Sequence, residues 1–276
     1  MGMIYALLGM GLVLLMRAIG VMNFAQGDLM TIGAYVSFWL TYDLNLPLIP
    51  MLICCLIIFS VNAAIFMYTC YMPVRNSKWG QSAMVCTLGA DMIIREALIL
   101  IFGAEQRTSQ ALIPGLLKIG PVVIEWQYIA VIILGFLVIW SVFTLFEKMY
   151  AGKAMMAASQ DQYAAKLLGI PISLTVLCTY IIVMIICGLA GWMIAPIFII
   201  STTMSSLQFK AFAGIIIGGL GSLKGAVVGC LTIGLLEAYS TYVTTTYKDV
   251  VVFGALLLML MIRPQGFFGE TNTEKA

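Results

Sequence analysis

Three charged side chains, Asp91, Arg95 and Glu96, occur within one long apolar stretch. Asp91 and Arg95 are four residues apart, so a helix places them on one face, where they can form an ion pair. Unpaired charges at membrane depth are costly, so these residues are expected to pair and to face inward. A proton or ion path is one possible role, and a structural tie between helices is the role that we favour. Two carboxylates and one guanidinium leave a net charge of about −1, which requires a further donor or water.

A second polar group interrupts the apolar sequence "RAIGVMNFAQGDLMTIGAYV" at residues 17–36, where Asn23, Gln26 and Asp28 lie among glycines. A tight turn at the inner membrane surface is one interpretation. The other is a broken helix lining a cavity, where the freed backbone groups meet a solute or water. On the second interpretation, the candidate transport-pathway residues are Asn23, Phe24, Gln26 and Gly27.

Glycines are frequent in "AFAGIIIGGLGSLKGAVVGCLTIGLLEAY", residues 211–239. Several are four residues apart, a spacing that lets helices approach closely, so close packing is the main expectation. The alternative is a gating hinge or re-entrant turn. The candidate gating or packing residues are Gly218, Gly219, Gly221 and Gly225. This segment and the "NFAQGD" break lie in opposite halves of the chain, which hints at an internal repeat.

A short polar stretch, "KAMMAASQDQYAAKLLGI", occupies residues 153–170 between two long apolar runs. Ser159 and Gln162 match a capping box, Gly169 suits a helix end, and Pro171 prevents continuation. These signals predict a helix at Gln160–Leu168, roughly 13 Å long, which is too short to cross a bilayer. Such a helix could rest on lipid headgroups or dock into a cytoplasmic partner.

The composition indicates the surroundings of these sites. The chain has 276 residues, of which 62% are hydrophobic and 9% charged, too few charges to cover a water-soluble fold. Its solidly apolar runs predict an all-α, polytopic membrane bundle in contact with the lipid bilayer, whereas the strands of a β-barrel would alternate. A net charge of +2 does not suggest nucleic-acid binding. The sequence contains no metal-ligand or nucleophile–base set, so no catalytic or metal residues are predicted.

Run length predicts about nine crossings in a single domain over residues 1–276, with some segments broken or re-entrant. They are 3–20, 28–43, 47–71, 82–102, 126–147, 173–199, 207–220, 225–244 and 248–262. Most Lys and Arg residues near short loops lie on the side that carries residues 148–172, which predicts that this segment is cytoplasmic. On the outer side, Pro and Gly residues interrupt the loop 103–125, which is expected to lie along the membrane surface.

Several of these motifs coincide with those of a known family. The segments "GVMNFAQGDLMTIGAYVSF", "AASQDQYAAKLLGI", "KAFAGIIIGGLGSLKGAVVGCLTIGLLEA" and "YKDVVVFGALLLMLMIRPQGFFG" resemble, in order, blocks of the permeases of branched-chain amino acid ABC importers. The resemblance runs from about Tyr5 to Gly269. It implies a multi-pass permease subunit of a bacterial inner membrane, and not an enzyme, that passes branched-chain amino acids to the cytoplasm.

The resemblance also implies partners and a coupling site. The partners would be a homologous second permease, two ATP-binding subunits and an extracytoplasmic solute-binding protein. The chain itself would need no cofactor, because Mg-ATP binds to the ATPases. The short polar helix would be the coupling helix seated in an ATPase groove. The implied coupling residues are Ala157, Ser159, Gln160, Asp161, Ala165, Leu168 and Gly169.

Two alternatives remain open at this point. Gln26 stands where the family often has His, and Asp91 and Arg95 stand where small or amide residues are expected. Urea and short-amide importers use closely similar permeases, so the substrate is left open. An ion-coupled secondary transporter that uses Asp91, Arg95 and Glu96 is the other alternative.

Overall fold

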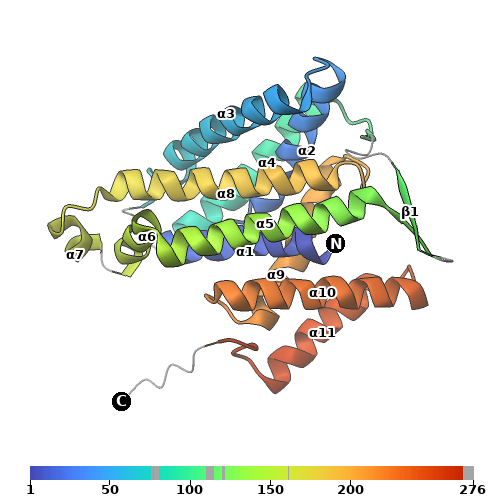
Figure 1. The fold of residues 1–276 in the computed structure, drawn as a ribbon. Coiled ribbons are helices and arrows are strands. Elements are labelled where there is room, and N and C mark those ends of the chain that lie inside the picture. The colour runs from blue at the N-terminus through green and yellow to red at the C-terminus, as the bar shows by residue number, and fades with distance from the viewer. Residues whose placement is uncertain (76, 78–80, 110–114, 120–121, 161, 270–276) are drawn as a thin grey trace.

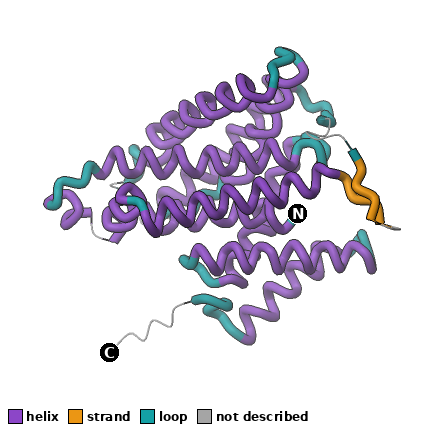
Figure 2. The backbone as a smooth tube through the Cα atoms, in the orientation of Figure 1, coloured by secondary structure: helices purple, strands orange, loops and turns teal. Residues whose placement is uncertain are grey.

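The computed structural model describes residues 1–276 apart from 76, 78–80, 110–114, 120–121, 161 and 270–276. Helices dominate the fold (Figures 1 and 2). The first half contains α1 (Gly2–Ile19), α2 (Gln26–Tyr42), α3 (Leu48–Phe66) with the π-helical turn η1 (Met67–Tyr71), α4 (Ser82–Phe102) and α5 (Trp126–Lys148). The second half contains α6 (Tyr150–Gln160), α7 (Gln162–Leu167), α8 (Ile172–Ile194), the 3₁₀ helix η2 (Thr202–Ser206), α9 (Leu207–Gly218), α10 (Leu223–Val243) and α11 (Lys248–Ile262).

Each of the nine apolar ranges expected from the sequence contains a helix. Among the described residues, five helical spans are both long and apolar enough to cross a membrane: Gly2–Ile19, Ile49–Tyr71, Trp126–Lys148, Ile172–Ile194 and Leu223–Val243. The remaining helices are shorter or more charged. α9 has 12 residues and is about 18 Å long, less than the apolar thickness of a bilayer. The total number of crossings therefore stays a prediction.

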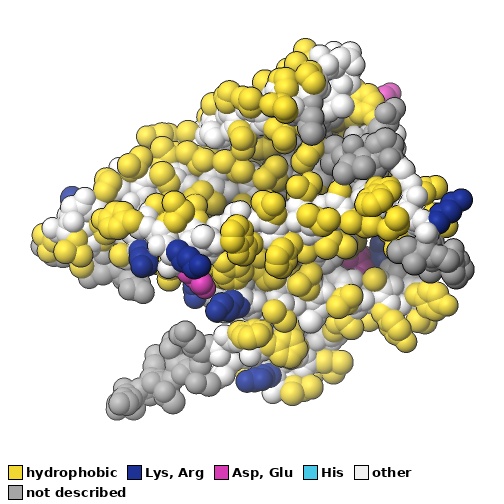
Figure 3. All heavy atoms as spheres, viewed as in Figure 1, with side chains coloured by type: hydrophobic (Ala, Val, Ile, Leu, Met, Phe, Trp, Pro, Cys, Tyr) yellow, Lys and Arg dark blue, Asp and Glu magenta, His cyan; other side chains and the backbone are white. Residues whose placement is uncertain are grey.

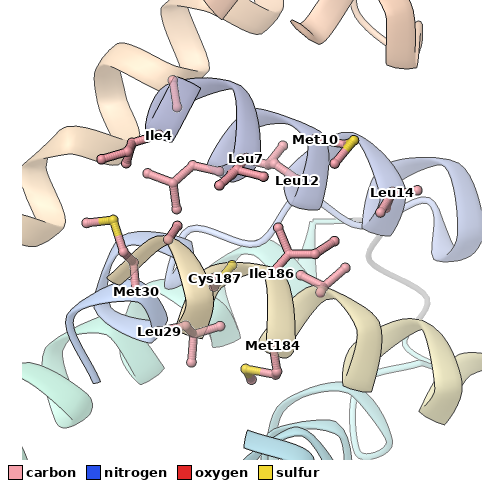
Figure 4. Packing of buried hydrophobic residues seen from close by; sticks show 14 of the residues in the cluster. Ile4, Leu7, Met10, Leu12, Leu14, Leu29, Met30, Met184, Ile186 and Cys187 are labelled. Atoms are coloured by element: carbon pink, nitrogen blue, oxygen red, sulfur yellow. The ribbon is translucent and has the colours of Figure 1, made fainter. Parts of the chain in front are cut away.

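Helix α1 is the centre of the bundle. In its 18-residue span, 72% of the residues are buried, and no side chain before Arg17 is charged. Figure 4 shows its apolar side chains above Ile186 and Cys187 of α8, which lie between the two helices, and all of these residues belong to one buried cluster with Leu29 and Met30 of α2. Lipid tails are as apolar as these side chains, so close van der Waals packing, and not exclusion of water, is what holds α1 in place.

The two halves of the chain follow the same plan in opposite directions. α1 runs toward the end of the molecule that carries α6 and α7, which we call the coupling end, and α8 runs away from it (Figure 1). After α1, residues 20–25 form a break, and α2, α3 and α4 follow. After α8, residues 195–206 form a second break that includes η2, and α9, α10 and α11 follow. The two halves thus share this order of elements, with α1 and α8 running in opposite directions, as is typical of an inverted repeat. The second break is thus 195–206 and not the glycine-rich segment 218–225, which the sequence analysis paired with the first.

A small antiparallel hairpin was not expected from the sequence. Strands β1 (Leu116–Ile119) and β2 (Val122–Glu125) pair Leu116 with Glu125 and Ile119 with Val122. Both runs are rich in Ile, Leu and Val, which favour strands, and a Gly-Pro pair joins them. The hairpin lies at the end opposite α6 and α7 (Figure 1). Arg107 and Ile200 exchange backbone hydrogen bonds of 3.1 and 2.8 Å, which fasten this outer loop to the start of the second break.

Candidate transport site and coupling end

The first break ends at a turn held by Asn23. The Asn23 side-chain oxygen accepts a hydrogen bond from the Ala25 N–H at 3.0 Å, and the Phe24 N–H donates to the Thr87 hydroxyl of α4 at 3.2 Å. The Gln26 amide donates to the Cys187 sulfur at 2.8 Å. Asn23 and Gln26 are 1% and 0% exposed, so in this structure they brace the turn from within. Their role in the pathway stays a prediction.

The first turn of α2 lies near the middle of the bundle. A Cβ atom added at Gly11, halfway along α1, would lie 2.5 Å from the Gln26 amide nitrogen. Cys187, which Gln26 contacts, is about 22 Å along α8 from the coupling end, counting 15 residues from Ile172. The chain therefore leaves α1 at the coupling end, returns through residues 20–25, and begins α2 about halfway along α1, which corresponds to mid-membrane depth if α1 spans the bilayer.

The second break meets the first at this depth. Gly27 packs directly on η2, where an added Cβ would lie 2.2 Å from the Ser205 carbonyl oxygen. The Gly27 N–H donates to the Gln208 side-chain oxygen at 2.7 Å. The helices that follow the two breaks thus begin side by side, and only glycine fits where their backbones touch.

Charged side chains from α2 and α4 gather around this junction, next to a hydroxyl group from η2. Arg95 of α4 donates to the Asp91 carboxylate at 3.4 Å and to the Ser205 hydroxyl at 3.1 Å. Asp28, in the first turn of α2, is 1% exposed and interacts electrostatically with Asp91 and Arg95. The expected Asp91–Arg95 contact is present. Glu96 is exposed and, in the described part of the chain, forms no ion pair with them. Grouping Glu96 with this pair was wrong, because one residue further along a helix points to another face.

The second repeat contains an ion network that the sequence analysis missed. The Lys210 ammonium group of α9 contacts Glu237 of α10 at 2.5 Å and Asp249 of α11 at 2.8 Å. The Tyr5 hydroxyl donates to the other Glu237 oxygen at 2.5 Å. A signal was present in the sequence: Gln208 and Lys210 are two residues apart just after the second break, as Gln26 and Asp28 are just after the first. The network links α1, α9, α10 and α11.

The glycines of 218–225 form a tight turn between α9 and α10 at the coupling end. A Cβ at Gly218 would lie 1.9 Å from the Gly225 carbonyl oxygen, so the two helices touch there. Gly219 and Gly221 have φ angles of 108° and 88°, and the Gly221 carbonyl accepts a hydrogen bond from Arg17. This geometry agrees with the packing interpretation. A gating movement of the turn is not tested by it.

Two cavities lie near the junction. One of about 440 Å³ is lined mainly by the second break and the start of α9, among them Ser201, Met204 and Ser206. The other, of about 1130 Å³, lies between α2, α3 and α4 and is lined mostly by apolar side chains. The larger cavity also has Asp43 and Arg107 in its lining, whereas hydroxyl side chains supply most of the polar groups of the smaller one.

The coupling end carries α6 and α7. The single helix predicted at Gln160–Leu168 is wrong at its start, because Ser159 and Gln160 are the last residues of α6 and α7 begins at Gln162. α6 packs through Met155 and Ala158, each 3% exposed, against the bundle. The predicted stop is correct. The Ile170 N–H bonds to the Ala165 carbonyl, the Gly169 N–H bonds to the Lys166 carbonyl, and Gly169 has a φ of 79°.

The side chains around this stop divide into buried and projecting groups. Ala165 is 2% exposed, whereas Leu167 and Leu168 are 72% and 79% exposed. Ala157 is half-buried within α6, and Asp161 lies outside the described residues. Figure 3 shows Lys and Arg side chains gathered around this end of an otherwise largely hydrophobic face. Exposed leucines beside cations are suited to a protein partner that covers them.

Comparison with known proteins identifies the fold and its family. A family model described as "Branched-chain amino acid transport system / permease component" matches residues 1–261. The chain belongs to this permease family. The permease is 30% identical over 296 residues to the high-affinity branched-chain amino acid transport system permease protein LivH of Salmonella typhimurium, with 100% of this chain and 94% of that protein covered. It is 28% identical over 290 residues to BraD of Pseudomonas aeruginosa, a permease protein described in the same words, with 99% and 94% covered.

A solved structure shares the fold of the permease. PsaBC from Streptococcus pneumoniae, in complex with Fab, superposes with a TM-score of 0.53 at 14% identity, covering 97% of this chain and 91% of that one. This likeness concerns the fold alone. With its family and its apolar helices, the permease is a multi-pass protein of the inner membrane.

Proposed function

We propose that this permease is the membrane-spanning subunit of an ATP-driven importer that passes branched-chain amino acids from an extracytoplasmic solute-binding protein to the cytoplasm. The observation that carries the proposal is the family match over residues 1–261, which includes both breaks and the coupling end. The closely related LivH and BraD permeases belong to high-affinity systems for these amino acids. A homologous second permease and two ATP-binding subunits would complete the importer.

The coupling end supports the part of the proposal that concerns the ATPases. Leu167 and Leu168 are exposed at the end of α7, just before the helix stop at Gly169 that fixes the backbone. Ala165 in the same turn is buried and anchors it to the bundle. A groove on an ATPase that receives these leucines would bury apolar surface and move with the bundle. The roles of Ala157, Ser159, Gln160 and Asp161 in this contact belong to the same proposal.

The two breaks support the part of the proposal that concerns transport. Helices that begin at mid-membrane depth leave backbone N–H groups free to meet a solute, which is a recurring arrangement in transporters. In this permease the second break lies beside a cavity of about 440 Å³, a size typical of small-molecule sites. Movement of the breaks against each other would open a path along Asn23, Phe24, Gln26 and Gly27, with the turn at Gly218, Gly219, Gly221 and Gly225 as a second moving part.

The test of the substrate is uptake by the complete importer in proteoliposomes, with its binding protein and ATPases. We expect ATP-dependent accumulation of labelled leucine, isoleucine or valine, and none of labelled urea. Accumulation of urea or a short amide without any branched-chain amino acid would contradict the proposed substrate while leaving the permease assignment intact.

A further inference from the structure

The charged group at the junction of the two breaks has unused hydrogen-bonding capacity. Among the described residues, no donor is placed to hydrogen-bond either carboxylate oxygen of Asp28, Oδ1 of Asp91 or Nε of Arg95, although Asp28 interacts electrostatically with Asp91 and Arg95. Each of these four atoms is shielded from solvent. A buried charged atom without a partner is costly, and native structures keep few of them without a functional reason.

The ion network of the second repeat shows what a saturated site looks like in the same protein. There, Lys210 contacts two carboxylates, and both oxygens of Glu237 have partners. The junction group differs, because its one ion pair is a single contact of 3.4 Å and the Arg95 side chain is 43% exposed. An ion pair that only held helices together would not need an arginine side chain this exposed.

We propose that Asp28, Asp91 and Arg95 form a transient binding site for the zwitterionic head group of an α-amino acid during its passage. Arg95, with the Ser205 hydroxyl beside it, binds the substrate carboxylate. The substrate ammonium group lies between the carboxylates of Asp28 and Asp91. This inference rests on the proposed function and adds the residues that recognise the substrate class.

The geometry explains why binding is weak enough for release. The 3.4 Å contact between Arg95 and Asp91 is long for a charge-assisted hydrogen bond, so exchanging it for contacts with the substrate costs little. A cavity of about 440 Å³ lies beside the same 3₁₀ helix, lined by Met204 and Ser206 and not by Ser205 itself, and would take the apolar side chain. Each direct hydrogen bond to a charged group of the substrate should raise its affinity about tenfold over a compound that lacks that group.

The test uses the assembled permease–ATPase complex in lipid nanodiscs without its binding protein, and saturation-transfer NMR with three probes. They are L-leucine, 4-methylpentanoate, which lacks the ammonium group, and 3-methylbutylamine, which lacks the carboxylate. We expect leucine to bind best to the unaltered complex. Arg95→Gln should weaken leucine about tenfold, to the level of the amine, and Asp28→Asn should weaken it to the level of the acid.

The controls separate this inference from loss of folding and from the proposed function. Glu96→Gln, which changes an exposed carboxylate on the same helix, should leave leucine binding unchanged. Arg95→Lys should retain part of the leucine binding. If Arg95→Gln alone fails to assemble, the double variant Asp91→Asn with Arg95→Gln takes its place, because it leaves no unpaired Asp91. This double variant should lose leucine binding. Leucine signals that are absent from the unaltered complex, or equal in all variants, would overturn the inference. ATP-dependent leucine uptake by the same complex with its binding protein would then still uphold the proposed function.

Discussion

At the residue scale, Lys210 is the side chain whose loss the bundle should tolerate least. Its ammonium group neutralises Glu237, which is only 6% exposed and lies against Tyr5 of α1. Lys210→Met should therefore lower the free energy of unfolding by about 3–5 kcal/mol, because it leaves a buried carboxylate uncompensated. Thermal unfolding of the purified protein in detergent, followed by intrinsic fluorescence, measures this change.

Two variants serve as references for that experiment. Lys224 pairs with Glu147 at 3.9 Å, with side chains 72% and 55% exposed, so Lys224→Met should change stability by roughly 0–1 kcal/mol. Lys210→Met combined with Glu237→Gln should be milder than Lys210→Met alone, because fewer charges stay unpaired. Equal stability of Lys210→Met and Lys224→Met would show that the network does not hold the bundle.

Gly27 is a second residue with a specific requirement. A methyl group there would meet the backbone of Ser205, which cannot move aside as a flexible side chain could. Gly27→Ala should therefore separate α2 from η2 and destabilise the fold by about 1–3 kcal/mol. Gly89 of α4 has nothing within 4 Å of an added Cβ, so Gly89→Ala should be neutral or slightly stabilising. The same unfolding measurement compares the two, and a Gly27→Ala protein as stable as Gly89→Ala would contradict the close contact of the breaks.

At the element scale, α7 and the turn after it are expected to determine ATPase binding. Leu168→Asp places a charge on a leucine that is 79% exposed, so the permease should still fold while losing its apolar contact with the partner. We expect the amount of ATPase that copurifies with the permease to fall at least severalfold. Leu116→Asp, on a leucine of the hairpin at the opposite end that is 59% exposed, should leave copurification unchanged. Normal copurification and normal uptake with Leu168→Asp would remove α7 from the coupling contact.

The elements also show how far sequence reasoning reaches. Run length placed the long helices correctly, and Gly169 with Pro171 placed the stop after α7, because both signals are local. The start of α7 was misplaced, since Ser159 matches a cap in sequence but lies inside α6. The second break was missed, because "APIFIISTTMSS" is apolar at first and reads as the continuation of a helix.

The candidate site was only partly predictable for a different reason. Asp91 and Arg95 are four residues apart, so one helix reveals their contact. Asp28 lies 63 residues before Asp91, and Ser205 lies 110 residues after Arg95. No local pattern in the sequence indicates that either residue comes close to this pair. The same holds for Lys210, Glu237 and Asp249, which three helices bring together.

At the scale of the whole molecule, the inverted repeat gives a physical reason for a gate at mid-membrane. Two helices begin beside each other there, one from each half, and their contact consists of close backbone approach and a few hydrogen bonds. A relative movement of the halves breaks few interactions at this junction. The saturated network around Lys210 joins α1 to α9, α10 and α11, so we expect α1 to move together with these helices of the second half.

The most direct measurement is the energy source of uptake by the complete reconstituted importer. ATP is supplied on the face that carries α6 and α7, the binding protein and labelled leucine are placed on the other, and an ionophore collapses the proton gradient. We expect leucine uptake to continue unchanged without the gradient and to stop when ATP is withheld. Uptake that stops with the gradient while ATP is present would contradict the ATP-driven importer and favour a secondary transporter.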